Sequence, residues 1–282
     1  MGLIVGLINL YLYNHNFFNL LNNLHINLNI ISVFFYIISF SSFLNTFDRR
    51  NKKSIVSFFA ITILSLDLLY ISKDMLLFIT TLIIYILLAT IKIFNSDIIK
   101  YKRIVVAIIL STILIMTLTV TFAQPHLLLR MLNPDAELVY MQNRLNQSKL
   151  IGDSEIPEGI NTDYYYMNFS NYSFIYLVEN YGKILGIFII SLLALLSIKI
   201  IFSYKAVKDK YGKFLIIGLG SFIFIQSLLN LLTLLGVINL GGNHIPFITH
   251  NNASIILYIL SVGLILSIYS RKNMNAVDSV TE

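Results

Sequence analysis

The chain contains the stretch Phe214-Leu-Ile-Ile-Gly-Leu-Gly-Ser-Phe-Ile-Phe-Ile-Gln-Ser-Leu-Leu-Asn-Leu-Leu-Thr-Leu-Leu-Gly-Val-Ile238, which has no charged side chain over 25 residues. About 20 predominantly apolar residues are enough for a helix to cross the hydrocarbon core of a bilayer. A helix is favoured there because it satisfies its own backbone hydrogen bonds in the absence of water. The stretch therefore predicts a transmembrane helix.

Apolar runs of the same kind recur along the whole chain. The 282 residues are 57% hydrophobic and 12% charged, with a mean hydropathy of +0.78, whereas a soluble domain has roughly 45–50% apolar and about 25% charged residues. This composition excludes a soluble globular enzyme and predicts one all-α polytopic membrane domain over residues 1–282, with about eight transmembrane helices. The expected spans are Leu3–Tyr13, Ile31–Phe47, Ile55–Tyr70, Met75–Ile93, Ile104–Phe122, Ile184–Ile201, Phe214–Ile238 and Ser254–Tyr269.

Positively charged residues are concentrated in alternate connections between these spans. Fifteen of the 20 Lys and Arg residues fall on one side with five of the 14 acidic residues, which gives a net charge of +10 there and −4 on the other side. Because cytoplasmic loops carry excess Lys and Arg, this asymmetry predicts that both termini are cytoplasmic. The overall charge of +6 then reports topology and does not indicate binding to nucleic acid.

One exterior connection, about residues 123–183, is far longer than the 2–8 residues usual between helices of a bundle. Long loops of this kind are functional or disordered, and the aromatic cluster Tyr164-Tyr165-Tyr166 argues against disorder. We therefore expect the loop to be the functional region. The C-terminal helices would occupy residues 184–273, followed by a short cytoplasmic tail at 274–282.

Charged residues inside this loop are the first candidates for chemistry. Carboxylates can act as general acids or bases, and Arg and Lys cations can hold a pyrophosphate. The alternative for each residue is an ordinary solvated charge. The carboxylates are Asp153, Glu155, Glu158 and Asp163, and the cations are Arg130, Arg144 and Lys149.

Polar residues at the ends of spans or within them form a second group of candidates. Lys73 and Asp74 lie at an exterior turn, where they either face a functional cleft or are solvated. Gln226 and Asn230 are four residues apart and share one helix face. They predict either an interhelical hydrogen bond or the polar wall of a cavity.

The chain lacks the patterns of the common metal and cofactor sites. It contains no cysteine, which excludes disulfides, thiolate catalysis and cysteine-based metal sites. His244 and His250 lie six residues apart without a nearby carboxylate, so we expect no metal site there. We expect no cofactor, and the sequence leaves the use of a divalent cation open.

Three stretches in the second half of the chain carry a family pattern. They are Glu179-Asn-Tyr-Gly-Lys-Ile-Leu-Gly186, Gln226-Ser-Leu-Leu-Asn230 and Ile245-Pro-Phe-Ile-Thr-His-Asn-Asn-Ala-Ser254. The first resembles the Glu-Glu-Leu-Gly that follows the catalytic loop in the SEDS family (shape, elongation, division and sporulation), the FtsW/RodA/SpoVE group of bacterial membrane proteins. The second resembles the family's penultimate span, and the third fits its Leu-Pro-Phe-Ile-Ser-Tyr-Gly-Gly-Ser-Ser without a gap. The resemblance runs from about Leu28 to Asn273.

This resemblance implies a glycosyltransferase that polymerises lipid II at the outer face of the bacterial cytoplasmic membrane, in division, elongation or sporulation, and releases undecaprenyl pyrophosphate. A class B penicillin-binding protein is the implied partner. A carboxylate would deprotonate the acceptor sugar hydroxyl, and Asp163 would be that base. The implied substrate-binding residues are Arg130, Lys149, Lys73, Asp74, Gln226, Asn230, Thr249 and Ser254.

The catalytic position has two alignments. Matching the family's Pro-Glu-x-His-Thr-Asp-Phe to Pro157-Glu-Gly-Ile-Asn-Thr-Asp163 requires an insertion of eight residues. Counting back without a gap from Glu179 puts Asn171 in the place of the aspartate, and an amide cannot be the base. The alternatives to an active enzyme are an inactive membrane scaffold of the same machinery and a membrane glycan enzyme of the O-antigen ligase or polymerase kind.

Two departures from the family concern other parts of the chain. The family's Gly-Gly is Asn251-Asn252 here. The family usually has about ten spans of about 20 residues each, and this sequence begins inside what would be the third. The resemblance therefore implies that two spans are missing at the N-terminus, either because the gene is truncated or because its start is misassigned.

Overall fold

The computed structural model describes residues 28–46, 52–71, 74–94, 136–152, 169–240, 245–249 and 252–272. These residues form helices joined by turns, and their only β-type pairing is a single bridge between Ile245 and Ile248. The elements are α3 (Leu28–Thr46), α4 (Lys52–Ile71), α5 (Met75–Phe94), α8 (Ala136–Gln147), α10 (Phe169–Tyr181), α11 (Lys183–Phe202), the 3₁₀ turn η1 (Ser203–Ala206), α12 (Lys210–Leu234) and α13 (Asn252–Ser270).

The described helices confirm the prediction of an all-α polytopic membrane protein. Four of them contain stretches long and apolar enough to cross a membrane, and α4 and α13 contain shorter apolar stretches. Six of the eight expected spans coincide with α3, α4, α5, α11, α12 and α13. The other two expected spans, Leu3–Tyr13 and Ile104–Phe122, lie outside the described residues.

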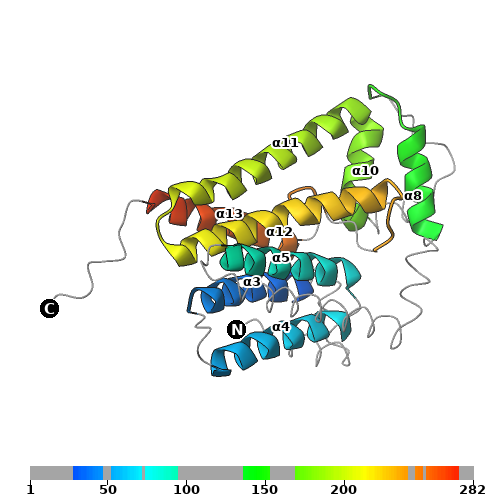
Figure 1. Cartoon of the computed structure of the whole chain (residues 1–282). Coiled ribbons are helices and arrows are strands. Elements are labelled where there is room, and N and C mark those ends of the chain that lie inside the picture. The colour runs from blue at the N-terminus through cyan, green and yellow to red at the C-terminus, as the bar shows by residue number, and fades with distance from the viewer. Residues whose placement is uncertain are drawn as a thin grey trace.

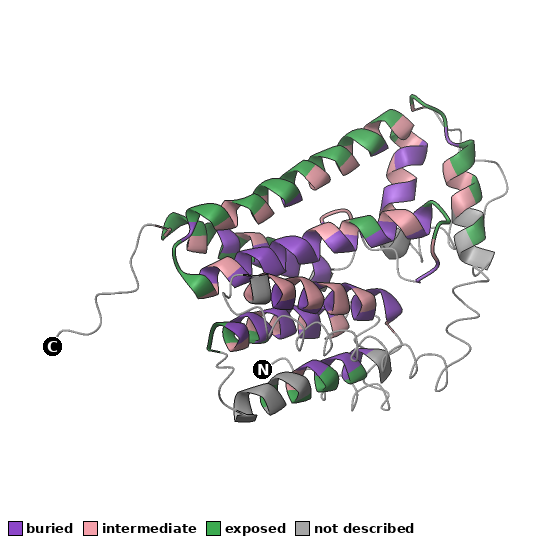
Figure 2. Cartoon of the chain, in the orientation of Figure 1, coloured by how far each residue is buried: buried purple, intermediate pink, exposed green. Residues whose placement is uncertain are grey.

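Helix α12 is the centre of the bundle, with α3, α5, α11 and α13 packed around it (Figure 1). Its span is 72% buried, whereas that of α11 is 11% buried, and Figure 2 shows the same contrast along the two helices. A helix that is apolar on all sides is buried among other helices or lies in lipid. Here α12 is buried among other helices, and most of α11 has the exposure of a helix that faces lipid.

Two glycines on opposite faces of α12 let its neighbours approach closely. A Cβ at Gly218 would lie 2.8 Å from the Cγ2 of Ile37 in α3, and a Cβ at Gly220 would lie 2.9 Å from the Cγ2 of Ile200 in α11. Small residues commonly allow such approach between membrane helices. The sequence Gly218-Leu-Gly220 therefore fixes where α3 and α11 meet α12.

Helix α10 packs against the N-terminal part of α11 and borders α8 (Figure 1). A small apolar cluster holds it there, made of Phe174, Ile175, Val178, Leu234 and Ile245. Both α8 and α10 lie in the segment that the sequence predicts as one long exterior loop. Two helices therefore give part of that loop a defined structure.

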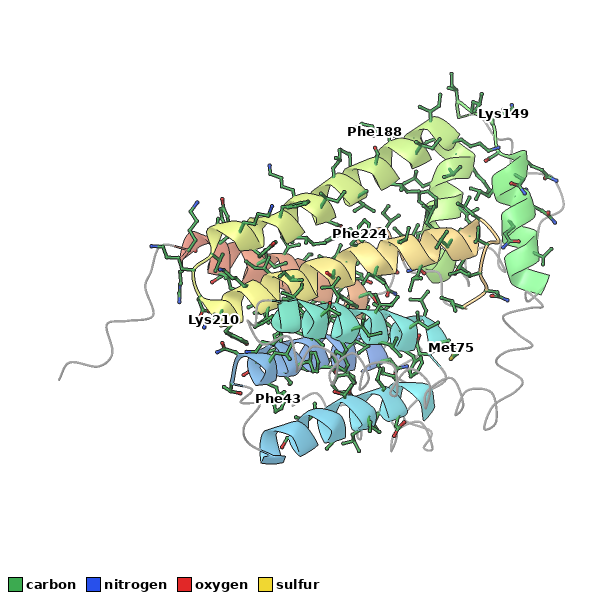
Figure 3. All side chains as sticks on the ribbon, viewed as in Figure 1. Phe43, Met75, Lys149, Phe188, Lys210 and Phe224 are labelled. Carbon is green, nitrogen blue, oxygen red and sulfur yellow. The ribbon has the colours of Figure 1, made fainter. Side chains whose placement is uncertain are left out.

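The bundle has two distinct ends (Figure 3). Met75 and Lys149 lie at one end, and Phe43 and Lys210 lie at the other. We call the first the loop end, because it carries α8 and α10. We call the second the lysine end.

Candidate functional site: the loop end of the bundle

Tyr258 of α13 is the residue around which the loop end is built. Its side chain is 0% exposed. The ring stacks on Phe222 of α12 at a centroid distance of 5.6 Å, and it lies 5.6 Å from the ring of Phe247 in the preceding connection. Asp74, at the start of α5, is near enough for its charge to act on the Tyr258 hydroxyl. Segments distant in sequence therefore converge on one phenol group.

The Tyr258 hydroxyl has no hydrogen-bond partner among the described residues. Buried polar groups are nearly always hydrogen-bonded in native proteins, and leaving one unpaired costs about 1–3 kcal/mol. A buried phenol without a partner among the described residues therefore requires a functional explanation. Ser254 lies one turn earlier on α13 and is also fully buried.

The connection before α13 makes a tight turn against Tyr258. The amide of Ile248 donates to the carbonyl of Ile245 at 3.0 Å, and Phe247 has a φ of 65°. A proline at the second position and a positive φ at the third are features of a type II turn. The third position normally takes glycine or asparagine, so Phe247 carries backbone strain. The turn is packed into the bundle, because Ile245 and Thr249 are 2% and 6% exposed.

Asp74 is the N-cap of α5. Its Oδ1 accepts a hydrogen bond from the amide of Leu77 at 3.2 Å, as N-cap carboxylates do. Its Oδ2 lies 3.4 Å from Nδ2 of Asn29 in α3. Asp74 is therefore neither a freely solvated charge nor a deeply buried one, and its carboxylate is oriented by two helices.

Gln226 and Asn230 are both buried inside the bundle, four and eight residues after Phe222 on α12. The hydroxyl of Thr80 in α5 lies 3.0 Å from Oε1 of Gln226 and 2.7 Å from the carbonyl of Leu76. Nδ2 of Asn230 donates to the carbonyl of Gln226 at 2.7 Å. Gln226 thus makes the interhelical hydrogen bond that its spacing predicted as one of two alternatives.

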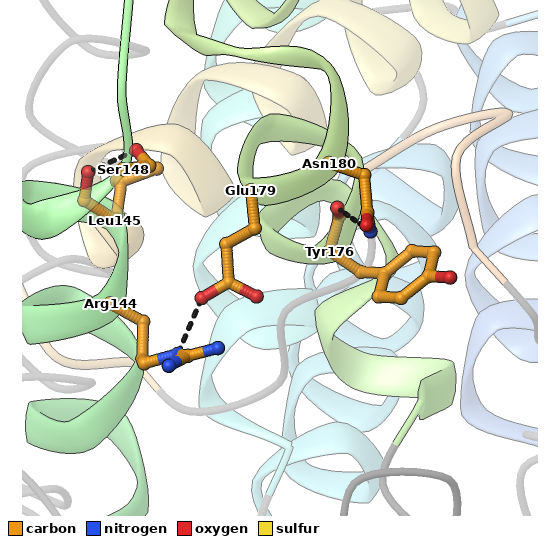
Figure 4. A network of polar contacts seen from close by, with 6 residues as sticks. All are labelled: Arg144, Leu145, Ser148, Tyr176, Glu179 and Asn180. Carbon is orange, nitrogen blue, oxygen red and sulfur yellow. Dashed lines mark hydrogen bonds and ion pairs between the residues drawn. The ribbon is translucent and has the colours of Figure 1, made fainter. Parts of the chain in front are cut away.

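A buried ion pair joins the two helices of the exterior segment (Figure 4). Nε of Arg144 in α8 lies 2.6 Å from Oε1 of Glu179 in α10, and the two side chains are 14% and 6% exposed. The sequence makes Arg144 a candidate cation for pyrophosphate, and in the structure its guanidinium pairs with Glu179. Gln142 of α8 also donates to the carbonyl of Thr233 in α12 at 3.2 Å. Helix α8 is therefore tied to both α10 and α12.

A backbone clamp holds the turn after α8 against the start of α11. The amides of Lys183 and Ile184 donate to the carbonyls of Lys149 and Leu150 at 3.0 and 3.1 Å. Gly182 makes this approach possible, because its φ of 94° and ψ of 160° are essentially restricted to glycine. A Cβ there would lie 2.5 Å from the carbonyl oxygen of Leu150. The clamp fixes the backbone of Lys149 and leaves its side chain exposed.

The structure distributes the sequence candidates over three places. Asp74, Gln226, Thr249 and Ser254 belong to the elements that meet around Tyr258, with Asn230 one turn further along α12, and Lys149 lies on the clamp. Asn171 lies in the first turn of α10. Lys73, Arg130 and Asp163 lie outside the described residues. Within the described ranges, no group of three or more His, Asp or Glu side chains is placed to hold a metal ion.

Sequence reasoning missed Tyr258, Gln142 and the partnership of Arg144 with Glu179. A signal existed for the first, since Tyr258 follows Ser254 by four residues and therefore shares its helix face. The ion pair has no such signal, because 35 residues separate its members in the sequence.

The fold and this site define a multi-pass α-helical membrane protein with buried polar groups at one end of its bundle. The chain belongs to the FtsW/RodA/SpoVE family of cell cycle proteins, whose model matches residues 28–274. The resemblance derived from the sequence is confirmed.

Individual relatives match shorter segments. The chain is 35% identical over 107 residues to the probable peptidoglycan glycosyltransferase FtsW of Bacillus subtilis, which covers 37% of this chain and 27% of that protein. It is 32% identical over 104 residues to stage V sporulation protein E of B. subtilis, covering 36% and 28%. It is 28% identical over 103 residues to the FtsW-named protein of Enterococcus hirae, covering 36% and 26%. The matched segments thus span about a quarter of the curated relatives.

A solved structure shares the fold. It is described as "Structural coordination of polymerization and crosslinking by a peptidoglycan synthase complex" and matches with a TM-score of 0.67 at 15% sequence identity. The match covers 89% of this chain and 71% of that chain. At this identity the similarity establishes the arrangement of helices alone.

Proposed function

We propose that this protein is a peptidoglycan glycosyltransferase that joins lipid II units at the outer face of the bacterial cytoplasmic membrane. The observation that carries the proposal is the arrangement of the loop end, where buried polar groups surround Tyr258 and the clamp presents Lys149. The names of the relatives support the substrate class. The alternation of charge supports an external loop end and cytoplasmic termini.

In the proposed reaction, a carboxylate removes the proton from an acceptor sugar hydroxyl. The hydroxyl oxygen forms a bond to the anomeric carbon of the donor as that carbon's bond to the pyrophosphate oxygen breaks. Asp163 is the proposed base, and the cations of Lys149 and Arg130 would hold the departing pyrophosphate. Undecaprenyl pyrophosphate leaves, and no nucleotide is required because the lipid pyrophosphate is itself the leaving group.

Within this proposal, the residues around Tyr258 support the substrate side of the site. Asp74 is held by Asn29 and by the N-terminus of α5, so its charge has a fixed position. Lys73 precedes it in the sequence and would contribute a cation to the same site. Gln226, Asn230, Thr249 and Ser254 would form the polar floor. A class B penicillin-binding protein is the proposed partner, in keeping with the described subject of the structural relative, a peptidoglycan synthase complex.

The test is a polymerisation assay with the purified chain and the class B penicillin-binding protein of the same organism, in liposomes with fluorescent lipid II. We expect glycan polymer from the native chain and a loss of about 100-fold or more in Asp163→Asn, as for removal of a general base. Asp153→Asn is the matched control, since it removes a carboxylate of the same segment. Polymer that persists in Asp163→Asn would exclude Asp163 from the role.

A non-catalytic scaffold is the second candidate, and one observation favours it. Asn171 lies in the first turn of α10, which begins at Phe169. The ungapped alignment puts Asn171 in the place of the family's aspartate, and an amide cannot act as the base. A scaffold would give no polymer with its partner, and the Asp163→Ala variant would rescue the defect of a strain that lacks the gene. An enzyme would give polymer, and Asp163→Ala would fail to restore the phenotype.

A further inference from the structure

The lysine end of the bundle carries a dense group of cations on adjacent elements. They come from the C-terminal ends of α5, α11 and α13, from η1, and from the start of α12. The described side chains are Lys92, Lys199, Lys205, Lys208, Lys210, Lys213, Arg271 and Lys272.

The single acidic side chain described at this end does not neutralise them. Asp209 is the N-cap of α12, and its Oδ2 accepts a hydrogen bond from the amide of Gly212 at 2.7 Å. A carboxylate at a helix N-terminus interacts with the positive end of the helix dipole. The surface around it therefore remains strongly positive.

Two of the lysines are positioned by exposed aromatic rings. Nζ of Lys205 lies 4.9 Å from the centroid of Phe202, and Nζ of Lys272 lies 4.4 Å from that of Tyr269 and 3.3 Å from its hydroxyl. Phe202 and Tyr269 are 57% and 37% exposed. Ammonium groups are attracted to ring faces, and aromatic rings favour the headgroup level of a membrane.

The two lysine–aromatic pairs belong to one packed unit. The η1 turn contacts α13 as well as α11 and α12. Val207, directly after η1, is 3% exposed, and a Cβ at Gly212 would lie 2.8 Å from the Cγ2 of Ile268 in α13. The turn that carries Lys205 is therefore fixed against the helix that carries Lys272.

We propose that η1 and the C-terminal end of α13 form a binding site for the phosphodiester headgroup of an anionic phospholipid. Lys205 and Lys272 would bind the phosphate oxygens, and Phe202 and Tyr269 would lie at the level where headgroup and acyl chain meet. Basic residues between membrane helices bind anionic headgroups in this way. The general excess of Lys and Arg in cytoplasmic loops accounts for the number of cations at this end. It does not explain why two of the lysines lie over exposed aromatic rings.

The test measures lipid binding to the full chain in detergent by native mass spectrometry, with phosphatidylglycerol, cardiolipin and phosphatidylcholine. The variant is Lys205→Gln/Lys272→Gln. The control is Lys199→Gln/Lys208→Gln, which removes the same charge from two exposed lysines of the same end that have no ring contact within the described part of the chain. We expect the first variant to bind the anionic lipids roughly tenfold more weakly than the control does.

Three results would overturn the proposal. An equal loss of binding in both double variants would mean a diffuse electrostatic attraction. Equal binding of phosphatidylcholine would mean that the headgroup is not selected. Full competition by inorganic phosphate would mean an anion site that does not require lipid. Thermal unfolding of both variants in phosphatidylcholine nanodiscs checks their folding. Phe202→Leu adds an independent measurement, since it keeps the apolar volume and removes the ring, and we expect it to weaken anionic lipid binding as well.

Discussion

Arg144 and Glu179 form a buried ion pair with an Nε–Oε1 distance of 2.6 Å between helices α8 and α10 (Figure 4). The contact lies in the segment that holds both candidates for the proposed catalytic position, since Asn171 is on α10 and Asp163 precedes α10 in the sequence. Its position suggests that the pair holds α10 in a fixed relation to α8 and the clamp. The energetics of buried pairs allow this idea to be tested.

Removing one member of the pair should destabilise the protein strongly. Arg144→Met leaves the buried Glu179 carboxylate uncompensated, which costs about 3–5 kcal/mol, and Glu179→Gln leaves the partly buried Arg144 cation and should cost less. Unfolding by SDS titration in mixed micelles measures this loss. The double variant Arg144→Met/Glu179→Leu should recover most of the stability, because buried ion pairs exchange for apolar residues at little cost. A double variant as unstable as the single ones would mean that the charges do not act as a pair.

The clamp predicts that glycine is required at residue 182. Gly182→Ala forces a Cβ into a backbone conformation restricted to glycine, directly against the carbonyl of Leu150. We expect a loss of about 2 kcal/mol or more in the free energy of unfolding. Gly263→Ala is the control, since a Cβ at that helical position meets nothing within 4 Å and should be neutral or stabilising by up to about 1 kcal/mol. Equal effects would contradict the clamp.

The hydrogen bond between Thr80 and Gln226 should appear as a coupling energy. A double-mutant cycle with Thr80→Val and Gln226→Leu should give about 0.6 kcal/mol, within the range found for membrane helices. Thr81→Val is the matched control, because the Thr81 hydroxyl bonds the carbonyl of Leu77 in its own helix at 2.8 Å. A coupling as large between Thr81 and Gln226 would show that the effect is a general loss of packing.

Tyr258→Phe should separate function from stability. Removing a hydroxyl that has no partner among the described residues should leave the free energy of unfolding unchanged or raise it by about 1 kcal/mol. If the phenol donates to substrate beside Asp74, polymer yield should fall about tenfold or more, the worth of a hydrogen bond to a charged group. The measurements are SDS unfolding and the lipid II assay.

Tyr85→Phe should have the opposite effect, with lower stability and unchanged polymer yield. The Tyr85 hydroxyl lies 3.0 Å from Oγ of Ser65, so its loss should lower stability by about 1 kcal/mol and leave polymer yield unaffected. If both tyrosine variants behaved alike, Tyr258 would have no place in the site.

Much of the fold could be predicted from the sequence, because apolar length alone decides which segments cross a membrane. The run around Gln226 predicted α12, and five further expected spans coincide with described helices. Helix α8 was not predicted, although its Ala, Glu, Leu, Met, Gln and Arg residues are good helix formers. Its 12 residues are too short and too polar to form a transmembrane span, so apolar length does not reveal this helix.

The candidate site could be predicted only in part. The family pattern indicated Asp74, Gln226, Thr249 and Ser254, and these residues lie on the elements that meet around Tyr258. The family pattern does not reveal which polar side chains already have a partner within the protein. Arg144 looked like a cation for substrate, and the structure pairs it with Glu179, because a buried carboxylate requires a nearby opposite charge.

The sequence by itself determined the membrane class, the order of the described spans and the family, because these depend on local composition and on short motifs read along the chain. The tertiary structure decided that α12 is enclosed while α11 faces outward, although both contain an apolar stretch long enough to cross a membrane. It also decided which polar side chains meet. In an apolar environment each polar group must find a partner in space, and those partners are set by helix packing over distances that a linear pattern does not contain.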